Sequence, residues 1–297
     1  MDNRSEVREF LTSRRAKVTP EQVGLPTFGG SRRVTGLRRG EVAQLAGVSA
    51  EYYTRLERGN LQGASESVLD AVARALLLDD AERAHLFDLA RAANASPRAR
   101  RRPAPQRVRP GIERVVEAIT APAWVRNGRS DFMASNRLAR ALYSPVFDRT
   151  HDQRGPANTA RFAFLDTRAR DFYVDWERTA NDIVAVLRAE AGRNPYDRGL
   201  TDLVGELSTR SEDFRVRWAT HDVQFHRTGF KRLRHPVIGG LDLTYEAMEF
   251  PSDPGLTLLV YTAEANSPTA DALGLLASWA ATVDREEQVD VPRATRP

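Results

Sequence analysis

Apolar side chains recur every three or four residues along residues 1–95, a pattern that predicts short amphipathic helices. The first of these runs includes Phe10 and Leu11. Ser5 is a candidate N-cap for this helix, and Pro20 ends it because proline cannot continue the backbone hydrogen bonding.

Four more helices are expected before residue 95. The stretch 37–59 contains two of them, and Ser65 is placed to cap the next one. Asp79 with Glu82 resembles a capping box for the last helix. Five short helices in so few residues predict a compact all-α domain over residues 1–95.

The composition changes abruptly after this region. The stretch "ASPRARRRPAPQRVRP", residues 95–110, has four prolines and six arginines and almost no apolar side chain. Such a segment cannot bury a core, so we interpret residues 96–110 as a basic, semi-extended linker.

Residues 111–285 mix both periodicities and predict an α+β domain. Asn127-Gly128 between two short runs is a strong hairpin signal, because both residues tolerate positive φ. A long helix is expected through Phe172 and Leu187, and two further helices follow it. Three strands, 229–235, 241–250 and 256–264, then precede a last helix that begins at Ser267-Pro268. Together these elements predict a five-stranded, mostly antiparallel sheet, with a disordered tail at 286–297.

The stretch "LRRGEVAQLAGVSAEYYTRLERG", residues 37–59, has the pattern of a helix-turn-helix. Ala43 is small where the second helix crosses the first, and Gly47 accepts the positive φ of the corner. Tyr53 and Leu56 fall on the inner face of the second helix. That helix is therefore expected to enter the major groove of DNA with its N-terminal end.

The outer face of this motif is polar and basic. Arg55 is the best candidate for reading a guanine, through the two parallel donors of its guanidinium. The candidate DNA-binding residues are Arg38, Arg39, Ser49, Ala50, Glu51, Thr54, Arg55 and Arg58.

Charge supports a polyanionic partner for the front of the chain only. Residues 1–110 carry 20 Lys and Arg against 13 Asp and Glu, whereas the remainder carries 24 against 27. The net charge of +4 therefore conceals a basic first part and a slightly acidic second part. A chance excess of solvated arginines is the alternative explanation.

Several functional classes find no support in the sequence. The chain has no cysteine, which excludes disulfides and thiolate chemistry and fits a reducing cytoplasm. No apolar run approaches the roughly 18 residues of a membrane span, and the first residues lack a signal sequence. The five histidines show no metal-ligand or catalytic spacing, and no nucleotide-binding loop is present. We expect no enzyme activity, no catalytic or metal-binding residue and no cofactor.

Aromatic residues concentrate between residues 124 and 218, and most of them are expected to form core. Because a few polar residues lie among them, we also expect a hydrophobic effector pocket with a polar mouth. The candidate ligand-binding residues are Trp124, Phe132, Asn136, Phe172, Trp176, Arg215, Trp218 and His221, with a polar head group at Asn136, Arg215 or His221.

The stretch 37–59 also resembles the helix-turn-helix of the phage-repressor-like (XRE) regulators, and more closely that of the MmyB-like subfamily, which is common in actinobacteria. Residues beyond the linker, among them "DFYVDWERTANDIVAVLRAEAGRNPYDRGL" and "GLDLTYEAMEF", are similar to the PAS-like ligand-binding domain of that subfamily. The resemblance covers nearly the whole chain. It implies a transcription regulator that binds double-stranded DNA and a small hydrophobic, fatty-acid-like effector.

The resemblance also bears on two positions of the DNA site. Arg39 stands where such repressors often have a glutamine that clamps a phosphate and buttresses the recognition helix, so the buttressing hydrogen bond is in doubt here. Ala50 stands where a base-reading polar side chain is frequent, which leaves base reading to Glu51, Thr54 and Arg55.

Three functions remain open from the sequence. The first is a ligand-responsive DNA-binding regulator that acts as a homodimer. The second is an enzyme of unknown reaction tethered to DNA, and the third is a DNA-binding protein whose C-terminal domain serves only dimerisation.

Overall fold

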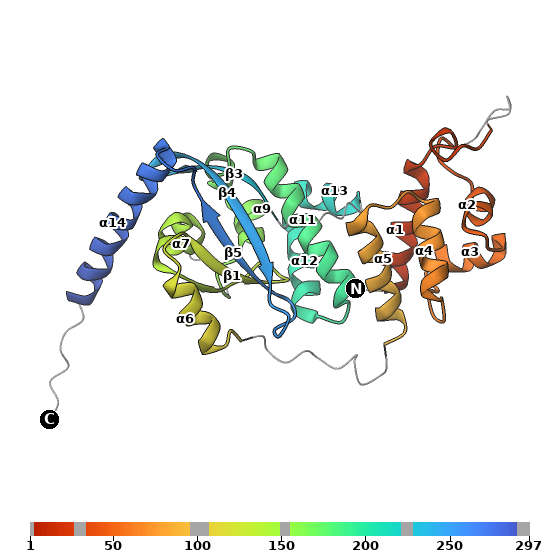
Figure 1. Cartoon of the computed structure of the whole chain (residues 1–297), viewed down its shortest axis with the longest axis horizontal. Helices are drawn as coiled ribbons and strands as arrows, with labels where there is room; N and C mark the ends of the chain where they lie inside the picture. Colours follow the sequence, from red (N-terminus) through yellow and green to blue (C-terminus); the bar gives the residue numbers. More distant parts are fainter. Residues whose placement is uncertain (1–2, 27–33, 96–106, 149–154, 221–227, 290–297) are drawn as a thin grey trace. The chain divides into compact units, whose positions relative to one another are not determined.

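The computed structural model describes residues 3–26, 34–95, 107–148, 155–220 and 228–289 (Figure 1). The chain divides into two compact units. Unit 1 consists of Met1–Ala104 and Val184–Phe225, and unit 2 consists of Pro105–Ile183 and His226–Pro297. The segment 184–225, which the sequence analysis placed in the C-terminal domain, therefore packs with the N-terminal helices.

Unit 1 begins with the five helices that the periodicity predicts. They pack around one core that includes Phe10, Tyr53 and Leu56, all fully buried. Their bounds, with a single 3-10 turn, are α1 Asn3–Lys17, η1 Glu21–Val23, α2 Arg39–Ala46, α3 Ala50–Glu57, α4 Glu66–Ala75 and α5 Asp80–Ala93.

Two of the three predicted N-caps agree with the observed helix N-termini. Ser65 accepts a hydrogen bond from the Val68 backbone N–H, and Asp79 forms the predicted capping box with Glu82, so both of these caps are confirmed. The prediction for Ser5 is wrong: α1 already begins at Asn3, and Ser5 lies inside its first turn.

The rest of unit 1 comes from later in the chain. It contains α12 (Arg198–Arg210), α13 (Glu212–Ala219) and the second half of α11 (Trp176–Arg193). Asp197 and Ser211 cap α12 and α13 with their side-chain oxygens.

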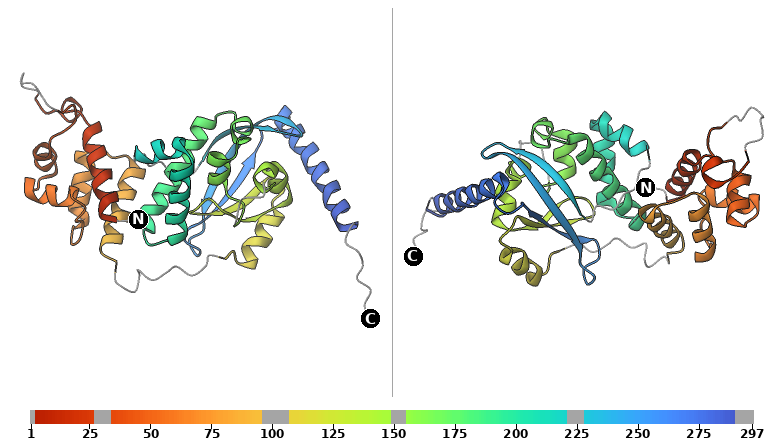
Figure 2. Two further views of the ribbon diagram at one scale, coloured as in Figure 1. Left: turned by 180° about the vertical axis from the view of Figure 1, so that it is seen from behind. Right: turned by 45° about the horizontal axis from the view of Figure 1, so that its top comes forward.

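Unit 2 is built on a five-stranded sheet with the order β2-β1-β5-β4-β3, and every pairing is antiparallel. The predicted α+β fold class with a five-stranded, antiparallel sheet is confirmed. Strands β3 and β4 form a long twisted ribbon (Figure 2). The strand bounds are β1 Ala123–Asn127, β2 Phe132–Ser135, β3 Thr228–His235, β4 Gly239–Glu249 and β5 Leu256–Thr262.

The two faces of this sheet differ, because successive side chains of a strand point to opposite sides. Val125 and Leu258 face α6 (Pro110–Ala118), where they meet Ile112 and Val116 in a small core. We call the opposite side the inner face; it carries Trp124 and residues paired with it across the strands.

The first hairpin is present, but its turn differs from the prediction. The left-handed residue is Ser130 (φ 65°), and neither Asn127 nor Gly128 has positive φ. The Asn127 side-chain oxygen instead accepts hydrogen bonds from the backbone N–H groups of Arg129 and Asp131. Asn127 thus shapes this turn through its side chain.

Short helices complete unit 2: α7 Arg137–Leu142, α8 Ser144–Phe147, α9 Thr159–Leu165 and α10 Ala169–Phe172. The single long helix expected through Phe172 is wrong, because the chain breaks between α10 and α11. There Tyr173 pairs with Leu233, and the Val174 N–H donates to the Arg232 carbonyl, so both residues extend the edge of β3.

The last helix, α14 (Pro268–Val289), begins where the Ser-Pro pair predicted. The Ser267 hydroxyl accepts a hydrogen bond from the Ala270 N–H, and Pro268 occupies the first helical position. The helix projects from the sheet (Figure 1) and extends to Val289, so it includes the first residues of the predicted tail at 286–297. Residues 290–297 lie outside the described part of the chain.

Candidate DNA-binding and effector sites

The corner between α2 and α3 has the geometry of a helix-turn-helix. Gly47 adopts a left-handed conformation (φ 66°, ψ 33°) at the end of α2. The Val48 N–H donates to the Ala43 carbonyl at 3.0 Å, and Ser49 caps α3 by accepting from the Tyr52 N–H at 3.0 Å. A side chain at Gly47 would strain this left-handed conformation, which favours glycine there. The corner sets the direction in which α3 leaves α2.

The inner side of α3 is anchored as predicted, since Tyr53, Leu56 and Ala43 are buried in the unit 1 core. The outer side presents the predicted DNA-binding residues. Thr54 is half-buried, and the other candidates are exposed: Arg38, Arg39, Ser49, Ala50, Glu51, Arg55 and Arg58.

Arg55 is held by a residue that the sequence analysis did not select. Its guanidinium lies over the ring of Tyr52, 4.7 Å from the ring centroid. Such cation–π stacking restrains a long side chain on an exposed helix face. The spacing of three residues along one helix was visible in the sequence and is the signal that could have identified Tyr52.

Arg39 connects the first residue of α2 to the end of α3. Its Nε donates to Glu57 Oε1 at 2.8 Å, and Arg15 Nε donates to Glu57 Oε2 at 2.6 Å. Glu57 is 1% exposed, so its charge is stabilised by these two guanidiniums rather than by water. Arg39 therefore does buttress the recognition helix, which the sequence analysis had left in doubt.

This contact perturbs the ionisation of Glu57. Burial acts to raise the pKa of the Glu57 carboxyl, but the hydrogen bonds and charges of Arg15 and Arg39 outweigh it and hold the pKa below its usual value. At neutral pH Glu57 is ionised, and it joins α1, α2 and α3 through the two arginines.

A second buried ion pair in unit 1 joins the N-terminal helices to the later segment. Arg188 of α11 is fully buried, and its guanidinium donates to the carboxylate of Glu6 on α1 and to the carbonyl of Trp218 on α13. The Trp218 ring also lies under that guanidinium, with 4.1 Å between Cζ and the ring centroid. Replacing one partner of such a pair leaves a buried charge uncompensated.

His85 of α5 lies beside this ion pair, with Nε2 3.8 Å from the Glu6 carboxylate. Burial lowers the pKa of His85, although the neighbouring Glu6 opposes the shift. Gly192 of α11 packs directly against the imidazole, because a Cβ built at Gly192 would lie 2.5 Å from two ring atoms. None of Glu6, His85 and Gly192 was among the predicted site residues.

Three of the predicted effector residues lie in an aromatic cluster of unit 2. Trp124 stacks on Phe132 with 3.8 Å between ring centroids, and Phe172 joins them through Tyr143. Trp176 is buried separately, and its indole N–H donates to the Ala163 carbonyl. The structure therefore brings Trp124, Phe132 and Phe172 together.

Asn136 does not have the predicted role at the head group, because backbone groups use all of its hydrogen-bonding capacity. Its Oδ1 accepts from the N–H groups of Ala123 and Ala139, and its Nδ2 donates to the carbonyls of Ile119 and Ala121. It caps α7 and ties it to β1.

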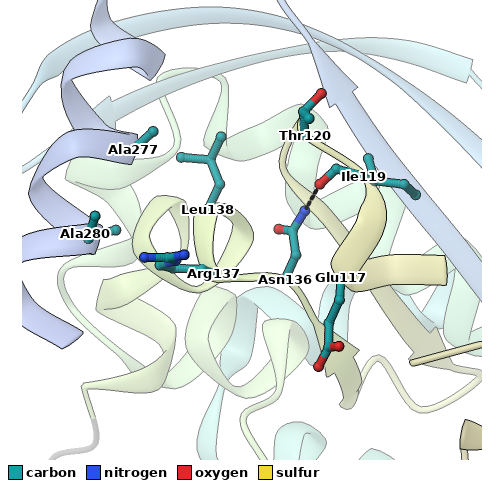
Figure 3. Close-up of a pocket in the computed structure, with 9 residues that line it drawn as sticks. Glu117, Ile119, Thr120, Asn136, Arg137, Leu138, Ala277 and Ala280 are labelled. Atoms are coloured by element: carbon teal, nitrogen blue, oxygen red, sulfur yellow. Dashed lines mark hydrogen bonds between the residues drawn. The ribbon is translucent and has the colours of Figure 1, made fainter. Parts of the chain in front are cut away.

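Asn136 also borders a small open hollow beside α7 and α14 (Figure 3). The hollow has a volume of about 260 Å³ and is lined in part by Arg137, Leu138 and Ala280. It lies apart from the aromatic cluster, whose residues do not line it.

The remaining predicted effector residues lie elsewhere. Arg215 is exposed on α13 and forms an ion pair with Glu212. Trp218 belongs to unit 1 with Arg188, as described above. His221 lies outside the described residues. The expectation that Arg215 meets the head group is thus not supported by its position on the surface of unit 1.

The inner face carries a set of phenols that the sequence analysis missed. The Tyr143 hydroxyl donates to the Tyr261 hydroxyl at 2.7 Å, and Tyr245 pairs with Tyr261 across β4 and β5. Burial raises the pKa of Tyr261 to about 12, while hydrogen bonding from Tyr143 opposes the shift. Alternating burial in "LDLTYEAMEF" and "LTLLVYTAE" was the available signal.

Two basic side chains share this inner face, Arg126 on β1 and Lys231 on β3. Both are half-buried, and Lys231 Nζ lies 5.3 Å from the centroid of the Tyr173 ring. Burial lowers the pKa of Lys231 to about 8; the charge of Asp182 opposes this shift, and that of Arg126 adds to it. Lys231 was not among the predicted site residues.

Other candidate chemistry is limited in the described part of the chain. Within it, no three His, Asp or Glu side chains are grouped in a way that could hold a metal ion. His235 is buried, and its Nε2 contacts the Ala141 carbonyl at 3.0 Å, a structural role. None of the described helices is long and apolar enough to cross a membrane.

Comparison with known families agrees with this arrangement. The model of a helix-turn-helix domain matches residues 6–86, and the model of the MmyB-like transcription regulator ligand binding domain matches residues 108–276. No curated protein matched the chain. Because the second match covers more than half of the 297 residues, the chain belongs to the MmyB-like transcription regulators.

Proposed function

We propose that the protein is a sequence-specific DNA-binding regulator of the XRE type whose DNA affinity responds to a small hydrophobic effector. The observation that carries the DNA part is the exposed, polar face of α3, held in place by the Gly47 corner and by the Arg39–Glu57–Arg15 contact. Such a protein acts where the DNA is, in the cytoplasm.

The candidate DNA contacts fall into two groups, contacts to bases and contacts to phosphates. Arg55, restrained on Tyr52, is our candidate for a guanine, and Glu51 and Thr54 are candidates for neighbouring bases. Arg38, Arg39 and Arg58 flank the reading face and are candidates for phosphate contacts, which position a protein without reading sequence. Ser49 and Ala50 lie at the N-terminal end of α3, where the groove floor is closest.

DNA binding is tested by selecting preferred sequences from random duplexes and titrating them at several salt concentrations. Each neutralised phosphate releases about 0.9 counterion, so phosphate contacts by Arg38, Arg39 and Arg58 imply a log–log salt slope of about −3 for each bound protomer. A flat salt response, or no enrichment of any sequence, would contradict the proposal.

We infer that the regulator binds DNA as a homodimer. The support is an apolar stripe on α14, where Leu275 is 67% exposed and Trp279, one helical turn later, is 39% exposed. A two-fold dimer would protect two half-sites about one helical turn apart. Sedimentation of Leu275→Ser with Trp279→Ser tests the surface, and a double variant that remains dimeric places the interface elsewhere.

The effector part rests on the aromatic cluster of unit 2. Trp124, Phe132 and Phe172 offer a mainly apolar environment beside the phenols of the inner face. An acyl tail buried there would contribute about 0.8 kcal/mol per methylene, so longer fatty acids should bind more tightly. Delipidated protein is titrated with fatty acids of increasing length and followed by melting temperature and by tryptophan fluorescence.

Regulation requires more than binding, because an effector with equal affinity for two conformations shifts neither population. The Glu6–Arg188 pair is the element we expect to transmit the change, since it ties α1 to α11. Measuring operator affinity with and without fatty acid distinguishes the alternatives: stabilisation without any change in DNA affinity would favour a C-terminal domain that only dimerises.

A further inference from the structure

The recognition helix α3 holds one of its arginines against an aromatic ring. The Arg55 guanidinium lies over Tyr52, with 4.7 Å between Cζ and the ring centroid. Tyr52 is half-buried and packs against the unit 1 core, and its backbone N–H donates to the Ser49 hydroxyl at 3.0 Å. The ring is therefore a fixed support that covers one side of an otherwise exposed guanidinium.

The hydrogen-bond donors of this guanidinium are unused within the described residues. Glu51 lies one helical turn before Arg55, a spacing that favours an ion pair, but in the part of the chain that the structure describes these two side chains do not pair. An ion pair would occupy the N–H groups at the edge of the guanidinium, whereas the ring contacts only its face. Tyr52 thus restrains Arg55 and leaves its N–H groups available for DNA.

A similar contact on α5 shows the difference. Arg83 lies over Phe87, with 4.8 Å between Cζ and the ring centroid, and Phe87 is also half-buried. There, however, Arg83 Nε donates to Asp70 Oδ1 at 2.8 Å, so that contact joins α4 and α5. Arg55 has the same kind of support without the acidic partner, which suits it to a partner outside the chain.

The geometry of DNA determines what such an arginine meets. A guanidinium that reads guanine lies close to the plane of the base, because two of its N–H groups donate to O6 and N7 at the major-groove edge. The neighbouring base pair is stacked about 3.4 Å away and lies along one face of the guanidinium. In a right-handed duplex, the pyrimidine on the 5′ side of the guanine places its C5 substituent over that edge.

Arg55 can offer only one face to this neighbour, because Tyr52 covers the other. A guanidinium is weakly hydrated, so covering its open face with a methyl group costs little desolvation and adds dispersion contacts. Thymine and 5-methylcytosine carry a methyl group at C5, whereas cytosine carries none.

We propose that Arg55 and Tyr52 together read a 5-methylpyrimidine followed by guanine, so that the preferred DNA site contains a TpG step or a methylated CpG step. This inference rests on the proposed DNA-binding function and names the base step that the recognition helix takes. Arg55 contacts the bases, and Tyr52 is a positioning residue that acts through Arg55. An unmethylated CpG step offers the guanine without the methyl group and should bind less tightly.

The experiment uses the full-length protein and the DNA site that it selects from random duplexes. The guanine of Arg55 is located as the base pair at which Arg55→Ala loses its preference. Replacing the thymine on the 5′ side of this guanine with deoxyuridine removes only the methyl group, and it should weaken wild-type binding roughly four-fold, the effect of one buried methyl group. A duplex with 5-methylcytosine at that position should bind roughly four-fold more tightly than one with cytosine.

Protein variants test whether the methyl effect depends on the stacked pair. Arg55→Lys keeps the charge without the planar group, so the ratio of affinities for the thymine and deoxyuridine duplexes should fall to about one. Tyr52→Leu should lower the ratio, whereas Tyr52→Phe keeps the ring and should retain it. A merely structural role of Tyr52 would weaken binding to both duplexes alike and leave the ratio unchanged. Phe87→Leu, which removes the ring beside Arg83, is the matched control and should retain the ratio.

The outcomes separate this inference from the proposed function. If a sequence is enriched but the deoxyuridine duplex binds as tightly as the thymine duplex, the methyl contact is refuted and the DNA-binding function stands. The inference also fails if Arg55→Ala relaxes no guanine, if a purine precedes that guanine, or if Arg55→Lys keeps the full ratio. An unchanged ratio in Tyr52→Leu overturns the role of Tyr52. If no sequence is enriched, both proposals fail.

Discussion

Glu57→Gln is expected to loosen the recognition helix. Glu57 is 1% exposed and binds Arg15, whose side chain is 14% exposed, and Arg39, whose side chain is 51% exposed. Removing one partner of a buried ion pair costs about 3–5 kcal/mol. For Glu57→Gln we expect the free energy of unfolding to fall by about 3 kcal/mol, because the half-exposed Arg39 regains water and contributes little. This loss corresponds to a fall in melting temperature of roughly 10 °C.

The effect has a defined pH dependence. The folded-state pKa of Glu57 is depressed, so its stabilisation is present above the unfolded value of about 4.3 and is lost as pH falls through the folded value. Gln cannot ionise. The difference in unfolding free energy between wild type and Glu57→Gln should therefore be greatest near pH 7 and should shrink as the pH falls below 4.

Calorimetry measures the unfolding free energy of the full-length protein, and hydrogen exchange with mass spectrometry measures protection of the α3 amides. Glu66→Gln is the matched control, because Glu66 is exposed in the first turn of α4 and its charge there is worth about 0.3–1 kcal/mol. Equal losses in the two variants, or an unchanged exchange rate in α3, would refute the role of Glu57.

Two further predictions concern reading and packing. Arg55→Ala should weaken binding to the preferred DNA site by about 1–3 kcal/mol and relax the preference at one base pair. Arg39→Ala should weaken binding to all DNA sequences alike. If Arg55→Ala loses equal affinity for preferred and random DNA, Arg55 reads no base. Gly192→Ala should destabilise unit 1 by about 1–3 kcal/mol in thermal melts, because the new Cβ would overlap the buried His85 ring. Gly205→Ala, in helix α12 with open space around it, should instead be neutral or stabilising, and the same sign for both glycine variants would contradict the packing argument.

The sequence alone determined the features that depend on local interactions. The period of the apolar residues predicted the five N-terminal helices, Ser65 and Asp79 predicted their caps, and Ala43 with Gly47 predicted the corner of the helix-turn-helix. Each of these signals acts within a few residues, through helix periodicity, capping or backbone conformation. A short stretch of sequence is therefore enough to identify it.

Features that join distant segments were decided only by the tertiary structure. The Glu6–Arg188 pair spans 182 positions, and the contact of Arg39 with Glu57 depends on how α2 and α3 cross. The position of Lys231 on the same sheet face as Tyr245 depends on the strand register, which no single strand specifies by itself. The effector residues predicted from the density of aromatic residues were partly misplaced for the same reason. Trp218 has the chemistry expected of an apolar pocket, but it lies beside Arg188 in unit 1. The buried charge of Arg188 requires partners from other segments of the chain, which the local sequence does not reveal.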